Sequence, residues 1–344
     1  MKISFKNDYS EGCHPNILEA LVKNNLQQQE GYGLDEYCEK AKDLILDKLD
    51  SKSSKVFFVS GGTQANLLVI SSILRPFESV ISAKTGHIFS NETGAIEATG
   101  HKINATPTTN GKLSPSNIQL VLDNHTKQPH QLKPKLVFIS NATEIGTIYS
   151  KKELQELAAF CTEKELYLYL DGARLAHALT AENNDLELAD LANLVDVFYL
   201  GGTKNGALIG EAIVINNLAL QKNFEYYIKQ KGAMLAKGRL LGIQFQELFK
   251  NDLYFKLAIH ANKQAMRIKE AFISIESKFL SETKTNQIFP ILKNAQIDKL
   301  SKEFDFHIWD KIDKDYSAIR VITSWATKEE DVDSFIKAIK NIQR

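Results

Sequence analysis

Short runs of apolar residues alternate with segments of helical periodicity along the first 220 residues of the chain. The apolar runs span 56–60, 79–83, 135–140, 166–170, 196–200 and 211–216, and segments such as 37–49 and 152–163 between them have helical spacing. Strands that are apolar on both faces are typical of a parallel sheet covered by helices on both sides. The sequence therefore predicts an α/β fold with a mainly parallel sheet, and functional groups in the loops at the carboxyl ends of its strands.

The character of the chain changes after residue 221. A helix-rich stretch, 224–279, precedes short strand candidates at 288–292, 304–309 and 319–324 and a last helix at 329–342. No internal repeat and no Gly/Pro-rich linker marks a boundary. We therefore expect residues 1–250 to form an N-terminal segment and a large domain, and residues 251–344 to form a small C-terminal α/β domain.

Composition excludes several classes of protein. Forty-two basic residues balance 42 acidic ones, which argues against a nucleic-acid-binding protein. The sequence contains no run of about 18 apolar residues, which a membrane-spanning helix would need, and its first residues lack the apolar segment of a signal peptide. The cysteines, Cys13, Cys38 and Cys161, form no CxxC pair, which predicts a reducing compartment and no metal site. We expect a soluble cytoplasmic protein.

A glycine-rich turn follows the first apolar strand. It reads Ser-Gly-Gly-Thr-Gln-Ala-Asn over residues 60–66, between a strand and a helix. Glycines allow a ligand to approach the backbone closely, and a helix N-terminus offers N–H donors to a phosphate. Thr63 would add a hydroxyl donor or merely cap the helix. The turn is neither a GxGxxG motif nor a P-loop, and a tight strand-to-helix turn is the alternative.

Two further clusters end later strands. Asp171 begins Asp-Gly-Ala-Arg at 171–174, and Lys204 lies in Gly-Gly-Thr-Lys-Asn-Gly at 201–206. A carboxylate at the end of a buried strand is costly unless it is paired, and desolvation would lower the pKa of the lysine. Taken alone, each also fits a structural role, as a helix cap beside a surface Arg174 or as a surface lysine.

The three clusters together are what a pyridoxal phosphate site requires. A lysine forms the Schiff base, a carboxylate keeps the pyridine nitrogen protonated, and a helix end holds the phosphate. The ring also needs a partner on its face, and His87 lies in the loop after a predicted strand, although a buried structural histidine is the alternative.

The sequence resembles the threonine aldolases, which belong with the aromatic β-eliminating lyases to pyridoxal-phosphate fold type I. Segments 5–10, 32–35, 62–66, 87–92, 171–174 and 319–323, together with Lys204, carry the resemblance. The resemblance implies a homotetramer built as a dimer of dimers, with sites at the dimer interface. It also implies roles for individual residues: Lys204 for the Schiff base, Asp171 for the pyridinium, His87 stacked on the ring, Gly62 and Thr63 on the phosphate, and Ser10, Tyr32, Arg174 and Arg320 for substrate, with Arg174 also beside the cofactor.

Three positions depart from the family pattern. Many relatives carry Glu-Asn-Thr-His where this chain has Ser-Asn-Ala-Thr at 140–143. Lys237 lies where many relatives have an arginine on the phosphate, and Arg239 is an alternative. Counting back from the strand at 136–140 places His130, rather than His125, at the position of a substrate-side histidine.

The implied reaction is the cleavage of L-threonine or L-allo-threonine to glycine and acetaldehyde, through a Schiff base on Lys204 and a quinonoid carbanion. His87 or His130 would take the β-hydroxyl proton. One alternative is β-elimination or another lyase reaction on a different β-substituted L-amino acid, because a fold does not select a reaction. Another is a non-catalytic module that binds a phosphate or nucleotide.

Overall fold

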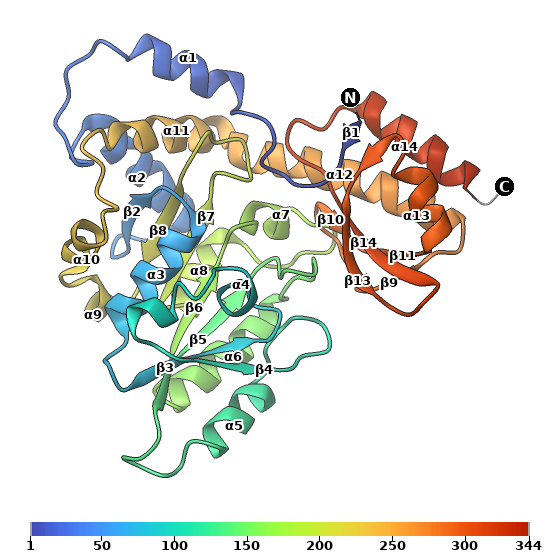
Figure 1. Cartoon of the computed structure of the whole chain (residues 1–344). Coiled ribbons are helices and arrows are strands. Elements are labelled where there is room, and N and C mark those ends of the chain that lie inside the picture. Colours follow the sequence, from blue (N-terminus) through green and yellow to red (C-terminus); the bar gives the residue numbers. More distant parts are fainter. Residues whose placement is uncertain (1, 343–344) are drawn as a thin grey trace.

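The computed structural model describes residues 2–342 and contains a seven-stranded sheet at its centre (Figure 1). The strand order is β2-β8-β7-β6-β5-β3-β4. Only β8 runs against its neighbours β7 and β2, and the other pairs are parallel. The strands are β2 (Lys55–Val59), β3 (Glu78–Ala83), β4 (Ile103–Thr106), β5 (Lys133–Ser140), β6 (Tyr167–Asp171), β7 (Val197–Gly201) and β8 (Glu211–Ile215). The prediction of a mainly parallel sheet is confirmed.

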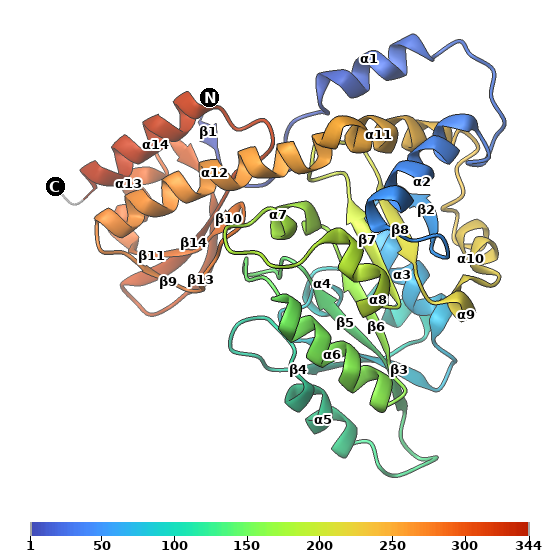
Figure 2. The same cartoon turned by 180° about the vertical axis from the view of Figure 1, so that it is seen from behind.

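Successive residues of the central strands enter two different cores. On β5, Val137 and Ile139 pack in one cluster with residues of α2, α6 and α11, whereas Leu136 and Phe138 pack in another with residues of α3 and α10. This is the alternation expected of strands covered on both faces. Figure 2 shows α6 on the face opposite to α3. The helices of this part are α2 (Glu36–Leu49), α3 (Gly62–Ile73), α4 (His87–Ser90), α5 (Pro115–Asp123), α6 (Lys151–Glu163), α7 (Leu175–Leu179), α8 (Leu191–Leu194), α9 (Leu218–Gln221), α10 (Phe224–Gln230) and α11 (Arg239–Phe249), with 3-10 turns at Glu97–Thr99, Leu188–Asp190 and Lys250–Asp252.

A smaller sheet lies at the other end of the long helix α12 (Leu253–Ser274), which runs between the two parts in both views (Figures 1 and 2). It is built around β14 (Tyr316–Ile322), which pairs antiparallel with three neighbours. The remaining elements of this part are β9 (Lys278–Phe279), β10 (Gln287–Ile288), β11 (Pro290–Lys293), α13 (Asn294–Leu300), β12 (Phe304–Asp305), β13 (His307–Lys311) and α14 (Glu329–Asn341).

The N-terminal residues belong to this smaller part. β1 (Ile3–Ser4) pairs with β12, and the ring of Phe5 stacks on that of Phe335 with centroids 4.8 Å apart. The chain then leaves toward α1 (Pro15–Lys23), which lies alongside α11. Residues 3–5 therefore pack with the smaller part, and the division at residue 250 stays a prediction. Between residues 2 and 342, no helix combines the length and the apolar character needed to cross a membrane.

Candidate active site

The three clusters found in the sequence meet at one edge of the large sheet. Gly62 begins α3 after β2, Asp171 ends β6, and Lys204 follows β7, so all three lie at carboxyl ends of parallel strands. His87, at the start of α4, follows β3 at the same edge. Glycines permit the close approach of β6 and β7: a Cβ on Gly172 would lie 1.8 Å from the carbonyl oxygen of Tyr199.

Asp171 is buried and accepts three hydrogen bonds. Its Oδ1 accepts from the Tyr199 hydroxyl at 2.6 Å and from the Ala173 amide at 3.0 Å, and its Oδ2 accepts from Nδ2 of Asn66 at 3.1 Å. Tyr169 donates to the Asn66 side-chain oxygen at 2.7 Å, which fixes the orientation of that amide. These donors offset the cost of burying a carboxylate.

Lys204 lies in the loop between β7 and β8, where its side chain is only partly accessible. Burial and the nearby charge of Arg174 lower the pKa of its amine, while Asp8, Asp171 and Glu211 act in the opposite direction. A lysine whose pKa is lowered has more of the free amine that acts as a nucleophile. This direction agrees with the sequence prediction.

Two glutamates hold His87. Glu92 lies 2.8 Å from its Nδ1, and Oε1 of Glu144 accepts from its backbone amide at 2.9 Å. Burial by itself lowers the pKa of His87, but the hydrogen bond to Glu92 and the charge of Asp171 outweigh it, so the net shift is upward. The neutral ring is thereby a stronger base than that of an ordinary histidine.

Glu144 belongs to the loop whose sequence departs from the family pattern. The same Oε1 also accepts from Oγ of Ser140 at 2.7 Å, and burial raises the pKa of the carboxyl group. Glu144, four residues after Ser140, therefore places its carboxylate at the end of β5. Sequence reasoning missed this residue, although the altered 140–143 segment marked the loop as unusual.

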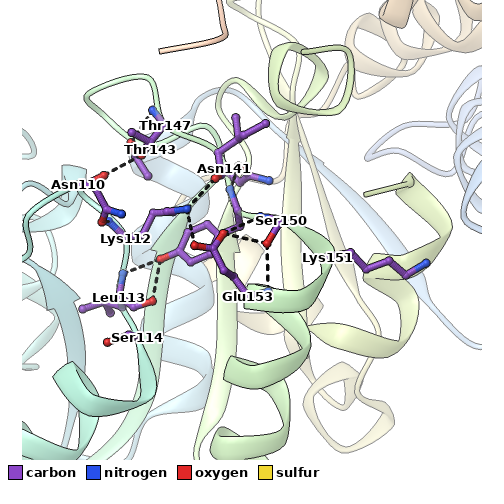
Figure 3. A network of polar contacts seen from close by, with 12 residues as sticks. Asn110, Lys112, Leu113, Ser114, Asn141, Thr143, Thr147, Ser150, Lys151 and Glu153 are labelled. Carbon is purple, nitrogen blue, oxygen red and sulfur yellow. Dashed lines mark hydrogen bonds and ion pairs between the residues drawn. The ribbon is translucent and has the colours of Figure 1, made fainter. Parts of the chain in front are cut away.

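A polar network fixes this loop (Figure 3). Lys112 pairs with Glu153 at 2.5 Å and donates to the Ile148 carbonyl at 3.1 Å, and the Thr147 hydroxyl donates to the Asn110 carbonyl at 2.7 Å. Within the loop, the hydroxyls of Thr143 and Thr147 lie 2.7 Å apart. These contacts fix the backbone of the loop that carries Glu144 from segments on both of its sides.

The predicted carboxylate-binding arginines differ in their partners. Arg174 binds Asp8 through Nε and Nη2, at 2.7 and 2.9 Å, in a buried bidentate ion pair. Arg320 has no carboxylate partner among residues 2–342: its buried Nε is unpaired and its guanidinium lies 4.7 Å from the centre of the Trp309 ring. The role of Asp8 was missed, although it stands in the segment 5–10 that carried the resemblance.

The glycine-rich turn at residues 60–66 leads into a helix with an open N-terminus. The helix α3 begins after Gly61 with no side-chain cap, so the N–H groups of its first turn remain available. Thr63 is exposed and does not cap the helix. A Cβ on Gly62 would lie 2.9 Å from the Tyr199 hydroxyl, which explains the need for glycine there.

His130 does not reach the site of its own chain. It is exposed in the turn before β5, at the amino end of that strand, whereas the other site residues lie at the carboxyl end. Eight strand residues separate the two edges, a distance of about 25 Å at about 3.3 Å per residue. Within one chain His130 therefore lies at the opposite edge of the sheet from Lys204 and Asp171, and its substrate-side role stays a prediction.

Three other predicted residues lie outside the cluster within one chain. Ser10 is exposed, and its hydroxyl donates to Asn7 at 2.9 Å. Tyr32 and Lys237 are exposed near the start of α11, where the Tyr32 amide donates to the Ala236 carbonyl at 3.1 Å. The alternative to Lys237, Arg239, donates to the carbonyls of Asn25 and Gln27.

The described residues contain no group of three or more acidic, histidine or cysteine side chains that would hold a metal ion. Burial and hydrogen bonding instead concentrate acids and bases around Lys204 and His87. Such an arrangement suits proton transfer and covalent attachment through an amine.

Comparisons with known proteins agree with this chemistry. The model of a family described as beta-eliminating lyase matches residues 8–295. A low specificity L-threonine aldolase of Pseudomonas aeruginosa is 32% identical over 301 residues, which cover 87% of this chain and 84% of that protein. A solved structure of Leishmania major threonine aldolase is 46% identical, covers 99% of this chain and 100% of that one, and superposes with a TM-score of 0.98.

A mutant aspartate aminotransferase of Thermus thermophilus shares the fold alone. It is 13% identical, with a TM-score of 0.73 over 99% of this chain and 91% of that one. The predicted fold type is confirmed.

Proposed function

We propose that this chain, which belongs to the beta-eliminating lyase family, is a pyridoxal-phosphate-dependent aldolase that cleaves L-threonine and L-allo-threonine to glycine and acetaldehyde. The observation that carries the proposal is the convergence of Lys204, Asp171 and His87 at one sheet edge beside the uncapped end of α3. The names of the relatives supply the substrate class, a β-hydroxy amino acid.

The residues at this edge fit the cofactor. The uncapped first turn of α3 and the absence of a Cβ at Gly62 suit a phosphate group, and the buried Asp171 suits a pyridinium nitrogen. The amine of Lys204, with its lowered pKa, suits covalent attachment to an aldehyde. When bound, pyridoxal phosphate supplies an acceptor for the electrons of the broken Cα–Cβ bond.

The other side chains orient the substrate and move its proton. Arg320, which has no carboxylate partner of its own among residues 2–342, binds the substrate carboxylate, and Arg174 adds the one terminal nitrogen that Asp8 leaves open. His87 receives the β-hydroxyl proton, because its pKa is raised and Glu92 stabilises the charged ring. Glu144 fixes the start of α4 and so the place of that ring.

The proposal extends to assembly and location. A homotetramer built as a dimer of dimers would bring Tyr32 and Lys237 of one copy to the site of another. Cys13, Cys38 and Cys161 are buried and unpaired, which supports a cytoplasmic enzyme.

Replacement of the lysine tests the activity. We expect Lys204→Ala to lose more than about 99% of threonine cleavage, about 2.7 kcal/mol or more, while remaining folded. Lys84→Ala, which removes an exposed lysine near His87, is the matched control. If the wild-type protein acts on tyrosine but not on threonine, β-elimination replaces aldol cleavage as the proposed reaction. Unchanged activity of Lys204→Ala would refute the assignment of the lysine.

A further inference from the structure

An irregularity in the small sheet places an aromatic side chain beside Arg320. From Ile308 to Asp310, two steps along β13 correspond to a single step along β14. Trp309 is therefore an extra residue with no partner on β14, as in a β-bulge. The strands β13 and β14 are neighbours in the small sheet (Figure 1). Bulges redirect side chains and are frequent next to active sites.

The ring of Trp309 contacts the guanidinium of Arg320. The guanidinium carbon lies 4.7 Å from the centre of the ring, within the reach of about 6 Å that is typical of a cation–π contact. The ring of Phe289 in turn packs against that of Trp309, with centroids 5.3 Å apart and an angle of 68° between the planes. Because Phe289 is completely buried, it fixes the ring on which the guanidinium rests.

The charge of Arg320 is not paired with an acid. Among residues 2–342 its guanidinium makes no ion pair, and its buried Nε has no hydrogen-bond partner. A free arginine side chain has many rotamers, and this freedom is lost when the side chain binds a ligand. The contact with Trp309 restricts the side chain in advance, so less freedom remains to be lost.

An aromatic ring and a carboxylate hold a guanidinium in different ways. The ring attracts the positive charge through its π face, whereas a carboxylate occupies the N–H donors. In Arg174, Nε and Nη2 are already engaged by Asp8. Arg320, held by a ring instead, keeps its donors for an incoming carboxylate, with which a guanidinium can form two parallel hydrogen bonds.

The two arginines lie where the small part of the chain meets the large one. Asn286, just before β10, donates to Asp8 at 2.9 Å and to the carbonyl of Thr323 at 2.8 Å. Asp8 binds Arg174 of the large part, and Thr323 follows Arg320 by three residues. The end of β14 that carries Arg320 is therefore joined by hydrogen bonds to the ion pair of Arg174.

We propose that Trp309 is a positioning residue, which holds the guanidinium of Arg320 in the orientation that receives the carboxylate of an amino-acid substrate. The inference rests on the proposed function for the identity of the ligand, whereas the contact between ring and guanidinium belongs to the protein alone. The ring acts on the substrate only through Arg320. Its loss weakens the binding of the carboxylate and leaves the groups around Lys204 in place.

Glycine binding tests the proposal without turnover, because glycine has the amine and the carboxylate but no β-hydroxyl. Trp309→Leu removes the aromatic face, and Trp309→Phe keeps a weaker one. In protein loaded with pyridoxal phosphate, visible absorbance should show glycine bound about tenfold more weakly by Trp309→Leu, with Trp309→Phe in between. Tyr167→Leu is the matched control: it removes a ring 4.9 Å from the Lys135 amine at the amino end of β6, and should bind glycine like wild type.

The kinetics of threonine cleavage separate positioning from a general loss of structure. A displaced guanidinium should raise KM about tenfold and lower kcat less than about threefold, whereas partial unfolding lowers kcat at unchanged KM. In an Arg320→Ala background, Trp309→Leu should change KM by less than about twofold, because the group through which the ring acts is absent.

A third measurement needs no cofactor. Phenylglyoxal modifies arginine side chains, and mass spectrometry follows the rate at Arg320 in cofactor-free protein. Release of the guanidinium from the ring should raise this rate about threefold or more in Trp309→Leu. Tyr167→Leu should leave the rate at Arg320 unchanged.

The outcomes distinguish the two proposals. Unchanged glycine affinity of Trp309→Leu, or an equal effect of Trp309→Leu with and without Arg320→Ala, would overturn the positioning role. Should Trp309→Leu fail to fold, Trp309→Met, with an adaptable side chain and no aromatic face, is judged by the same criteria. Wild-type protein that binds no pyridoxal phosphate would refute the proposed function. The modification rate of Arg320 then decides the inference, and an unchanged rate in Trp309→Leu overturns it.

Discussion

At the scale of single residues, the Asp8–Arg174 ion pair is the most deeply buried charge pair at the site. Burial alone would raise the pKa of Asp8, but Arg174 and Lys204 lower it from 3.8 to about 2. A carboxyl group whose pKa is lowered on folding stabilises the protein above its unfolded pKa, and this stabilisation is lost as the pH falls through its folded pKa. Between about pH 4 and pH 2, wild type should therefore lose about 2 kcal/mol that Asp8→Asn does not lose.

Urea unfolding of both proteins between pH 6 and pH 2.5 measures this difference. The advantage of wild type over Asp8→Asn should be largest above about pH 4 and shrink below it. Asp305→Asn, which removes a half-exposed acid 3.7 Å from Lys6, should show little change at any pH. A gap between wild type and Asp8→Asn that is independent of pH would mean that Asp8 is not the ionised partner of Arg174.

Sequence reasoning found the residues that end parallel strands and missed the acids that support them. Asp171 and Lys204 are adjacent to the strands that place them, so a local pattern indicates them. Asp8 meets Arg174 across 166 positions, and no local pattern predicts that contact. Glu211 begins β8, which is antiparallel to β7, so the amino end of β8 lies at the edge where the parallel strands end. A search limited to residues at the carboxyl ends of strands therefore does not find Glu211.

At the scale of elements, α11 packs on α2 with no room at Gly242. A Cβ there would lie 2.5 Å from the Cys38 amide nitrogen and 2.7 Å from its Cα. Alanine raises helix propensity by about 1 kcal/mol over glycine, yet Gly242→Ala must separate the two helices. We expect a net loss of about 2 kcal/mol in the free energy of unfolding, measured in urea. Gly12→Ala is the control, because a Cβ at Gly12 meets nothing within 4 Å; equal stability of the two variants would contradict the tight contact.

The elements with strong periodicity were predicted well, and short ones were not. The apolar runs at 56–60, 166–170 and 196–200 correspond to β2, β6 and β7 within one residue at each end. The strand β4 was missed, since its four residues include Asn104 and Thr106 and lack an apolar run. The predicted strand at 304–309 is divided between β12 and β13, which pair with different partners. Tertiary pairing decides such short segments more than local preference does.

At the scale of the whole molecule, one surface of the chain exposes apolar side chains that no described residue covers. The exposed fractions are 50% for Leu18, 78% for Val22, 92% for Leu26 and 68% for Leu34. Tyr32 lies against the segment just before α11, where its amide donates to the carbonyl of Ala236, the residue before Lys237. Apolar patches of this kind mark contact surfaces between proteins. A second copy of the chain is the partner that the proposed oligomer supplies.

Subunit mixing tests whether the site is shared between two copies. If Lys237 acts in the partner's site, each active site combines Lys204 of one chain with Lys237 of the other chain. Lys204→Ala and Lys237→Glu then inactivate a site through different chains. A mixed dimer then contains one intact site, and random exchange at equal amounts should restore about a quarter of wild-type activity. Lys204→Ala mixed with Asp171→Asn is the control, since both residues come from the same chain and no intact site forms. Sedimentation would verify that subunits exchange. Exchange without recovery in the Lys204→Ala and Lys237→Glu mixture would place Lys237 in the site of its own chain, and full activity of Lys237→Glu alone would place Lys237 outside the site of either copy.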